Sequence, residues 1–346
     1  MRADRSGGDW EIDTVQPVLA ASVADLATYY PDSATTHPIA AMGGPMLALY
    51  DRDPDRAFAM FDRYSRSEDP WVQAAAPLLR GTFGSILGRM EWAESDCQAA
   101  LAAFRALGEA WGTAAVLMTL AEFAKLRGDF AAAVAALEEA AALGHELGAW
   151  GDLSHIAGKL AAIRLREGDL ASARADLERA ERDQAERGSG PSDAKAWLSL
   201  VRAELLCREG DLGAAGWLCA QQLAWLDGKQ SAWWYGTRAV VLVRLAMIAL
   251  ADGDRDRSRA LLADALSTAT DWVELPAIAD VVDAIAVYSA ESATLAAALL
   301  GAAHSIRGCF DEGSLDAPRG PGFPARAARP RRIRGRLRAR PRAGPR

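Results

Sequence analysis

The four histidines and four cysteines are the side chains best suited to bind a metal or to act as nucleophiles, and their spacing predicts neither role. The histidines are His37, His145, His155 and His304, and the cysteines are Cys97, Cys207, Cys219 and Cys309. No two cysteines form a C-x-x-C pair, and none lies near a histidine at metal-ligand spacing. We therefore expect buried thiols in a reducing compartment, polar surface histidines and no metal site.

Sequence motifs for phosphate binding and nucleophilic catalysis are missing as well. Gly228-Lys229 lacks the upstream glycine and the following hydroxyl residue of a phosphate-binding loop. No G-x-S-x-G pattern marks a nucleophilic serine, and no G-x-G-x-x-G pattern follows a strand. Carboxylates such as Glu138-Glu139 fall on the solvent faces of expected helices. The sequence predicts a protein that is not an enzyme and that uses no cofactor.

Tryptophan is the residue type that points most clearly to binding, because the chain has 11 of them. Aromatic side chains concentrate binding energy at protein interfaces. The candidates for a partner-binding groove are Trp197, Trp233, Trp234 and Tyr235. Three consecutive aromatic residues point around a helix, so at least one of residues 233–235 should be poorly buried. The alternative interpretation is that the tryptophans pack as wedges between neighbouring helix pairs.

A repeated turn organises the part of the chain that carries these residues. Gly-Asp occurs at 128–129, 168–169, 210–211 and 253–254, and Met90-Glu91 fills the same place upstream. Gly can adopt the left-handed conformation that ends one helix, and Asp can accept the backbone N–H groups that begin the next. The positions 90, 128, 168, 210 and 253 are 38 to 43 residues apart. This period predicts an all-α, right-handed α-α superhelix of tetratricopeptide-like helical pairs.

Apolar periodicity and composition divide the chain into three regions. We expect an N-terminal segment at 1–38 with one helix over Glu11–Tyr30, a helical repeat solenoid at 39–312, and a disordered Arg/Pro/Gly-rich tail at 313–346. In helix 91–108, Leu101, Phe104 and Leu107 should form the buried stripe. The expected solenoid helices are 39–50, 55–65, 70–87, 91–108, 113–126, 130–147, 152–166, 170–187, 193–208, 211–226, 232–251, 256–270, 274–289 and 292–307.

The net charge of −7 hides an asymmetry between the body and the tail. Eleven of the 39 basic residues lie in 319–346, which has no acidic residue, so residues 1–318 carry 28 basic and 46 acidic residues. The acidic body should repel nucleic acid, and only the tail could attract it. The tail is equally well interpreted as a frameshift product of GC-rich DNA. We found no membrane-spanning run and no signal peptide, so the sequence predicts a cytoplasmic protein.

Several segments together resemble the C-terminal repeat region of large actinobacterial transcriptional regulators. These regulators are of the streptomycete antibiotic regulatory protein type, which carries a bacterial transcriptional activator domain. A related repeat region occurs in large LuxR-type regulators. The matching segments are Asp69–Ala74, Ala99–Glu109, Trp111-Gly112, Leu120–Glu122, Arg127–Asp129 and Ala298–Gly308.

The resemblance implies a function by what it includes and what it lacks. Such regulators combine a winged-helix DNA-binding domain, an activator domain and a nucleotide-binding switch with this repeat region. The resemblance covers about residues 40–316 and extends to none of the first three parts. It implies a protein-interaction or effector-sensing module whose partner is a protein or another domain of a regulator. The alternatives are a stand-alone repeat adaptor, or nucleic-acid binding through the Arg-rich tail.

Overall fold

The computed structural model describes residues 43–50, 53–187, 192–227, 232–271 and 275–312, and these residues form fourteen α-helices. The predicted all-α repeat fold is confirmed. The expected helix at Glu11–Tyr30 and the tail at 313–346 lie outside the described residues. The helices are α3 (Gly43–Tyr50), α4 (Pro54–Tyr64), α5 (Pro70–Ile86), α6 (Met90–Leu107), α7 (Ala110–Leu126), α8 (Phe130–Leu147), α9 (Trp150–Glu167), α10 (Leu170–Arg187), α11 (Ser192–Glu209), α12 (Leu212–Leu226), α13 (Ala232–Ala251), α14 (Arg255–Asp271), α15 (Leu275–Tyr288) and α16 (Ala293–Arg307).

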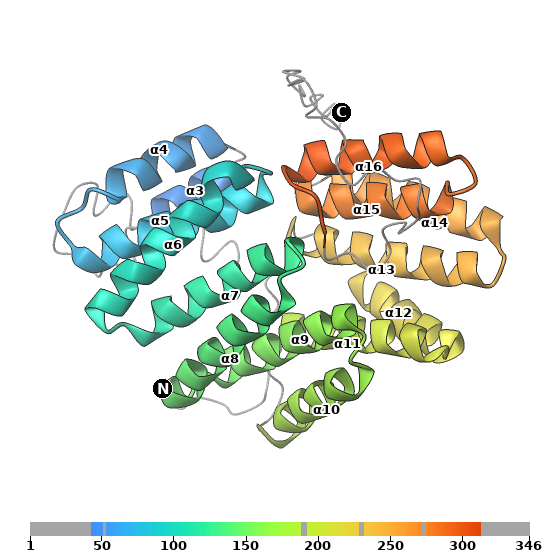
Figure 1. Cartoon of the computed structure of the whole chain (residues 1–346), viewed down its shortest axis with the longest axis horizontal. Coiled ribbons are helices and arrows are strands. Elements are labelled where there is room, and N and C mark those ends of the chain that lie inside the picture. Colours follow the sequence, from blue (N-terminus) through green and yellow to red (C-terminus); the bar gives the residue numbers. More distant parts are fainter. Residues whose placement is uncertain (1–42, 51–52, 188–191, 228–231, 272–274, 313–346) are drawn as a thin grey trace, which may run out of the picture.

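Consecutive helices pack in pairs, and the pairs stack into a curved array (Figure 1). From α5 onward, each odd-numbered helix packs against the even-numbered helix that follows it, and each even-numbered helix packs against the next pair. The odd-numbered helices also contact one another, as α9 contacts α11 and α13 contacts α15. This is the arrangement of a tetratricopeptide-like solenoid, in which each pair buries its apolar face against its neighbours.

The Gly-Asp turns form as their local chemistry predicts. Gly128 has a φ of 72°, and the Asp129 carboxylate accepts a hydrogen bond from the Ala132 backbone N–H at 3.1 Å. Left-handed backbone favours glycine, and a carboxylate at this position satisfies an otherwise unpaired N–H group of the new helix. The same left-handed glycine and the same carboxylate hydrogen bond recur at Gly168-Asp169, Gly210-Asp211 and Gly253-Asp254.

Small residues fill much of the core between the helices. Fully buried alanines recur along the array, and larger side chains such as Phe104 and Leu137 fill the spaces between them. Alanine lets helix axes approach closely. The buried residues form several clusters along the array. The expectation that Leu107 is buried is wrong, because this side chain is 43% exposed. It stands in the last turn of α6, where the left-handed Gly108 turns the chain away toward α7.

The array curves far enough for its last helix pair to meet the α5–α6 pair. Helices α5 and α15 are in contact, and α16 ends close to the turn between α5 and α6 (Figure 1). The approach is so tight that a Cβ added at Gly308 would lie 2.3 Å from the Gly88 carbonyl oxygen. Gly308 also has a φ of 86°, so this position is specified for glycine twice.

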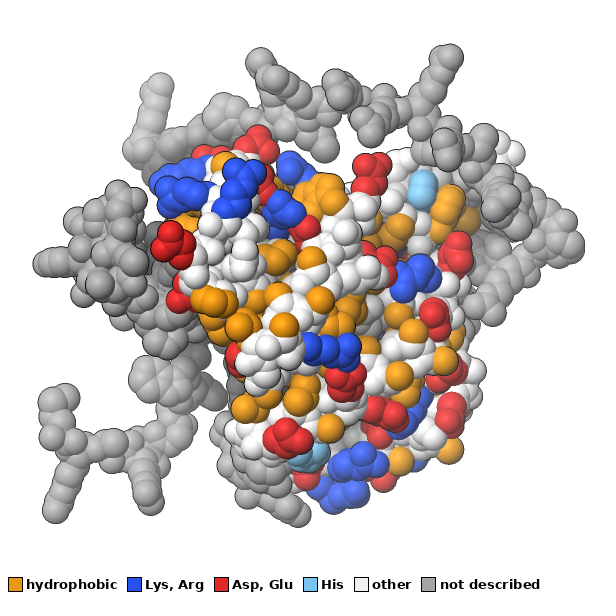
Figure 2. All heavy atoms as spheres, turned by 60° about the vertical axis from the view of Figure 1, so that its left-hand side comes forward, with side chains coloured by type: hydrophobic (Ala, Val, Ile, Leu, Met, Phe, Trp, Pro, Cys, Tyr) orange, Lys and Arg blue, Asp and Glu red, His pale blue; other side chains and the backbone are white. Residues whose placement is uncertain are grey.

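The surface seen in Figure 2 carries acidic and basic side chains together, with hydrophobic side chains in small separate groups between them. Several charges pair between repeats, as Arg105 of α6 does with Glu139 of α8, and Arg174 of α10 with Glu209 of α11. Exposed pairs of this kind contribute little to stability. None of the helices in the described residues is long and apolar enough to cross a membrane.

Candidate partner-binding groove

The inner side of the curved array encloses a cavity of about 480 Å³. Its walls come from the odd-numbered helices α7, α9, α11, α13 and α15, from α16, and from the residues that follow α16. We call this cavity and its walls the inner groove. Its floor is apolar, and its apolar lining residues include Leu165, Leu200, Val201, Val243, Met247 and Val281. A concave apolar surface of this volume with a few polar groups is the usual form of a ligand site.

Trp197 stands in the wall of the inner groove and also wedges two helices apart. Its indole ring lies so close to Gly158 of α9 that a Cβ there would come within 2.7 Å of it. The ring also lies 6.1 Å from the ring of His155. Its Nε1 atom is buried and has no hydrogen-bond partner among the described residues. The residue therefore combines the wedge position with a place in the wall of the groove.

Charged side chains in the groove are mostly paired with each other. Glu204 of α11 forms ion pairs with Arg208 on its own helix and with Arg244 on α13. Both arginines line the cavity. Because Glu204 bridges two odd-numbered helices, it holds adjacent repeats together across the floor of the groove.

The residues after α16 cross the groove as a non-helical segment, Gly308–Glu312, which we call the strap. The Phe310 ring stacks on the His304 ring of α16, with centroids 3.8 Å apart and planes 13° apart. The Glu312 backbone N–H donates to the Leu126 carbonyl oxygen at 2.8 Å. Leu126 is the last residue of α7, where helix carbonyls lack partners within the helix. The strap thus joins the last helix of the array to α7.

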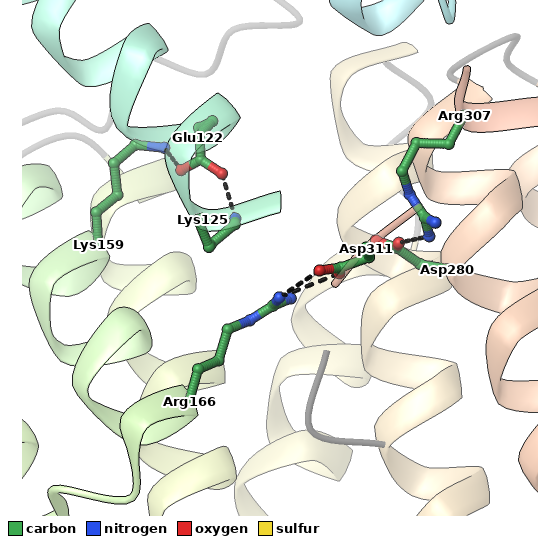
Figure 3. A network of polar contacts seen from close by, with 7 residues as sticks. All are labelled: Glu122, Lys125, Lys159, Arg166, Asp280, Arg307 and Asp311. Atoms are coloured by element: carbon green, nitrogen blue, oxygen red, sulfur yellow. Dashed lines mark hydrogen bonds and ion pairs between the residues drawn. The ribbon is translucent and has the colours of Figure 1, made fainter. Parts of the chain in front are cut away.

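The strongest contact of the strap is the ion pair between Asp311 and Arg166 (Figure 3). The Arg166 Nη1 atom donates to both carboxylate oxygens of Asp311, at 2.9 and 3.1 Å. The Asp311 side chain is only 8% exposed. Burial disfavours the charged form of Arg166. The charge and hydrogen bonds of Asp311 outweigh burial and raise the pKa of Arg166 above the ordinary value. The pair links residues 145 positions apart.

Arg307 anchors the base of the strap. It is 2% exposed and donates to Asp280 and Asp283 of α15, both at 2.6 Å. Burial raises the pKa of Asp283 to about 6, although Arg307 acts in the opposite direction. With Arg166 and Asp311, these three residues form what we call the closure cluster.

A second group of charges lies on the other side of the same region and joins only neighbouring repeats. Glu122 of α7 accepts from Lys125 on its own helix and from Lys159 of α9, the latter at 2.6 Å (Figure 3). Burial alone would raise the pKa of Glu122, but the two lysines outweigh burial and hold it well below the ordinary value. We call Glu122, Lys125 and Lys159 the repeat cluster.

The sequence-based candidates are only partly covered by the structure. Trp197 lines the groove, and its role in binding a partner stays a prediction. The side chains of Trp233, Trp234 and Tyr235 lie outside the described residues, although α13 includes their positions. Cys97 and Cys219 are buried, which raises the pKa of their thiols to about 12 and about 11. In the described residues, no group of three or more His, Cys, Asp or Glu side chains is placed to hold a metal ion.

Sequence reasoning missed both charge clusters. It placed the carboxylates on solvent faces, and this is wrong for Asp96 and Asp176, which are buried against arginines. It also gave no role to Asp311. The spacing of Glu122 and Lys125 was a usable signal, since residues three apart share a helix face.

Comparison with known proteins finds a likeness to solved structures of tetratricopeptide-like repeats. No family model and no curated protein sequence matches the chain. Two similar solved structures are tetratricopeptide-like repeats of a protein described as a putative kinesin light chain from Podosopora anserina. One carries a single substitution and is 17% identical, with a TM-score of 0.42 over 60% of this chain and 98% of that one. The other is 18% identical, with a TM-score of 0.42 over 59% and 98%. The tetratricopeptide domain of P58(IPK) is 14% identical over 84% and 89%, with a TM-score of 0.23. None of the three is described as a transcriptional regulator.

Proposed function

We propose that the chain is a protein-interaction module whose inner groove binds a segment of a partner polypeptide. The observation that carries this proposal is the groove itself. It is a cavity of about 480 Å³ with an apolar floor, and paired charges on successive odd-numbered helices line it. Such a surface offers side-chain pockets and hydrogen-bonding groups at regular intervals along the array. Superhelical repeat proteins commonly use their concave surfaces in this way.

Selection from a random peptide library tests the proposal directly. Twelve-residue peptides displayed on phage are selected against the immobilised full chain, and enriched peptides are synthesised with a fluorescent label. Met247→Glu places a charge in the apolar floor, so it should weaken peptide binding by at least tenfold. Leu295→Glu is the matched control, because Leu295 lies on α16, is 49% exposed and does not line the groove. If no peptide binds, or if both variants behave alike, the proposal is wrong.

We also propose that this module belongs to a transcriptional regulator, where it would sense an effector or contact another domain. Support for this finer assignment comes only from the resemblance of segments such as Asp69–Ala74 and Ala298–Gly308. Reading the genomic DNA on both sides of the gene tests it. Upstream coding sequence for a winged helix and a phosphate-binding loop would support it, and an isolated in-frame gene would instead favour a stand-alone adaptor.

Nucleic-acid binding through the Arg-rich tail stays an alternative that the described residues do not address. Deleting residues 319–346 should abolish salt-sensitive binding to a random-sequence DNA duplex if the tail is responsible, because arginines that neutralise phosphates release counterions. Unchanged binding would exclude the tail, and an absence of binding by the intact chain would exclude the activity. The cytoplasmic location likewise remains a prediction from the sequence.

A further inference from the structure

We infer that the strap, Gly308–Glu312, is a built-in occupant of the inner groove, and that the partner segment replaces it. The inference rests on the proposed function, and it specifies the chemistry of the partner. That partner is a non-helical acidic segment that places a carboxylate on Arg166 and an aromatic side chain against His304. The strap would then hold the groove closed to weak or mismatched ligands.

The contacts of the strap are those of a bound peptide rather than those of a repeat. It contributes one main-chain hydrogen bond, from the Glu312 N–H to Leu126, one carboxylate that receives both of its hydrogen bonds from Arg166, and one stacked ring. Main-chain hydrogen bonds combined with a few side-chain pockets are the usual means by which a domain recognises a peptide. The same atoms of Leu126, Arg166 and His304 are available to another segment with the same groups.

The charge of the groove favours an acidic occupant. Five basic side chains line the cavity, and without Asp311 only three acidic side chains face them. The basic residues are Lys125, Arg166, Arg208, Arg244 and Arg307, and the acidic residues are Glu204, Asp280 and Asp283. Within the described residues, Glu204 pairs with Arg208 and Arg244, Asp280 and Asp283 pair with Arg307, and Lys125 pairs with Glu122, which does not line the cavity. Removal of the strap therefore leaves Arg166 partly buried and without its carboxylate, which is costly unless a new anion arrives.

The aromatic residue of the strap is accessible to a competing segment. The Phe310 side chain is 42% exposed although its ring is stacked, whereas Arg307 at the base of the strap is 2% exposed. A tether this short gives the strap a local concentration on the order of millimolar. A partner peptide must compete with the strap for the groove. The peptide should therefore bind the wild-type chain more weakly than it binds a chain whose strap contacts have been removed.

The test uses the full chain and the double variant Phe310→Ala/Asp311→Asn, with Asp256→Asn as a control. Asp256 is an exposed carboxylate on α14, so its loss changes the net charge equally without touching the strap. Twelve-residue random peptides on phage are selected against each chain, and fluorescein-labelled synthetic copies are titrated by anisotropy. We expect peptides with Asp or Glu near an aromatic residue. They should bind the double variant at least tenfold more tightly than they bind the wild type or Asp256→Asn.

Arg166 supplies the second half of the test. In the double variant, Arg166→Met should weaken peptide binding at least tenfold, and Arg166→Lys should restore part of it because the charge returns without the guanidinium geometry. Circular dichroism confirms that each variant keeps its helix content. Peptides that lose binding with Met247→Glu but ignore Arg166 and the strap would overturn this inference and leave the proposed function standing. If no peptide binds any of the chains, the proposed function fails and this inference fails with it.

Discussion

The repeat cluster and the closure cluster are both partly buried groups of charges beside the inner groove, but they connect different kinds of neighbours. Glu122 contacts Lys125 three residues away and Lys159 in the next pair, so the repeat cluster follows the order of the array. Arg166 and Asp311 are 145 residues apart, and they pair only because the array curves back on itself. The first cluster belongs to the architecture of a repeat. The second depends on the overall curvature and can be broken without removing any helix.

The largest expected effect comes from removing the close approach on which the closure cluster depends. Gly308→Ala should lower the free energy of unfolding by roughly 2–4 kcal/mol, because alanine is strained at positive φ and its Cβ would collide with the Gly88 backbone. Gly253→Ala is the matched control, since Gly253 has a similar φ of 82° with nothing within 4 Å of the added atom. Its cost should be about 1 kcal/mol. Urea denaturation compares the two, and equal costs would show that the closure contributes no stability.

The repeat cluster should be the next most sensitive. Glu122→Ala leaves Lys125 and Lys159 facing each other with side chains 19% and 15% exposed. Glu122 itself is about a third exposed, so solvent reduces the penalty, and we expect a loss of about 1–2 kcal/mol. Glu139→Ala removes a comparable but exposed ion pair with Arg105 and should cost less than about 0.5 kcal/mol. Thermal unfolding of the two variants separates them, and equal shifts would contradict the special position of Glu122.

The two clusters should also respond oppositely to pH. Asp283 has a folded-state pKa of about 6, above the usual unfolded value of about 3.9, so the folded protein holds this proton more tightly. The stability that this proton contributes is full below about pH 4 and is lost as the pH rises through 6. The lowered pKa of Glu122 has the reverse sign, since its contribution is present at neutral pH and is lost on acidification.

Asp283→Asn isolates the closure cluster in this comparison. As the pH rises from about 4 to 7, the free energy of unfolding of the variant should rise by about 1 kcal/mol relative to that of the wild type. This value allows for the 25% exposure of the Asp283 side chain. Asp256→Asn, on a side chain that is 90% exposed, should show no such trend. Urea midpoints at several pH values give the answer, and a difference that does not vary with pH would contradict the buried position of Asp283.

The smallest expected change in stability comes from the strap. Asp311→Asn keeps a polar side chain opposite Arg166, which is 26% exposed and also lies in the field of Asp280 and Glu122, so it should cost only about 1 kcal/mol. Its local effect should be larger, because Cys309 lies in the strap and burial raises the pKa of its thiol. We expect several-fold faster alkylation of Cys309 by iodoacetamide, quantified by peptide mass spectrometry. The fully buried Cys97 serves as the internal control, and an unchanged Cys309 rate would show that Asp311 does not hold the strap in place.

The helix pairs could be predicted from the sequence because their signals are local. Helices α8, α10 and α13 have the predicted bounds, since a Gly-Asp turn or an apolar period specifies each of them. The groove could be predicted only in part. Trp197 lies in its wall, but the partner of Arg166 depends on the curvature accumulated over several repeats, which no local pattern records. Asp311 was overlooked for a related reason, since it follows the last helix and has no periodic neighbour.

The contact between Gly88 and Gly308 has a consequence for folding cooperativity. In a linear array the terminal pairs each have one neighbour, so they fray first and unfolding proceeds from the ends. Because α5 touches α15 here, the array approaches a loop in which the α5–α6 pair and the last pair support each other, and α3–α4 extends beyond it. Contacts between such distant parts of the chain slow folding, since a large loop must close before they form. In return, none of the helix pairs from α5–α6 to α15–α16 can unfold alone without also opening the ring.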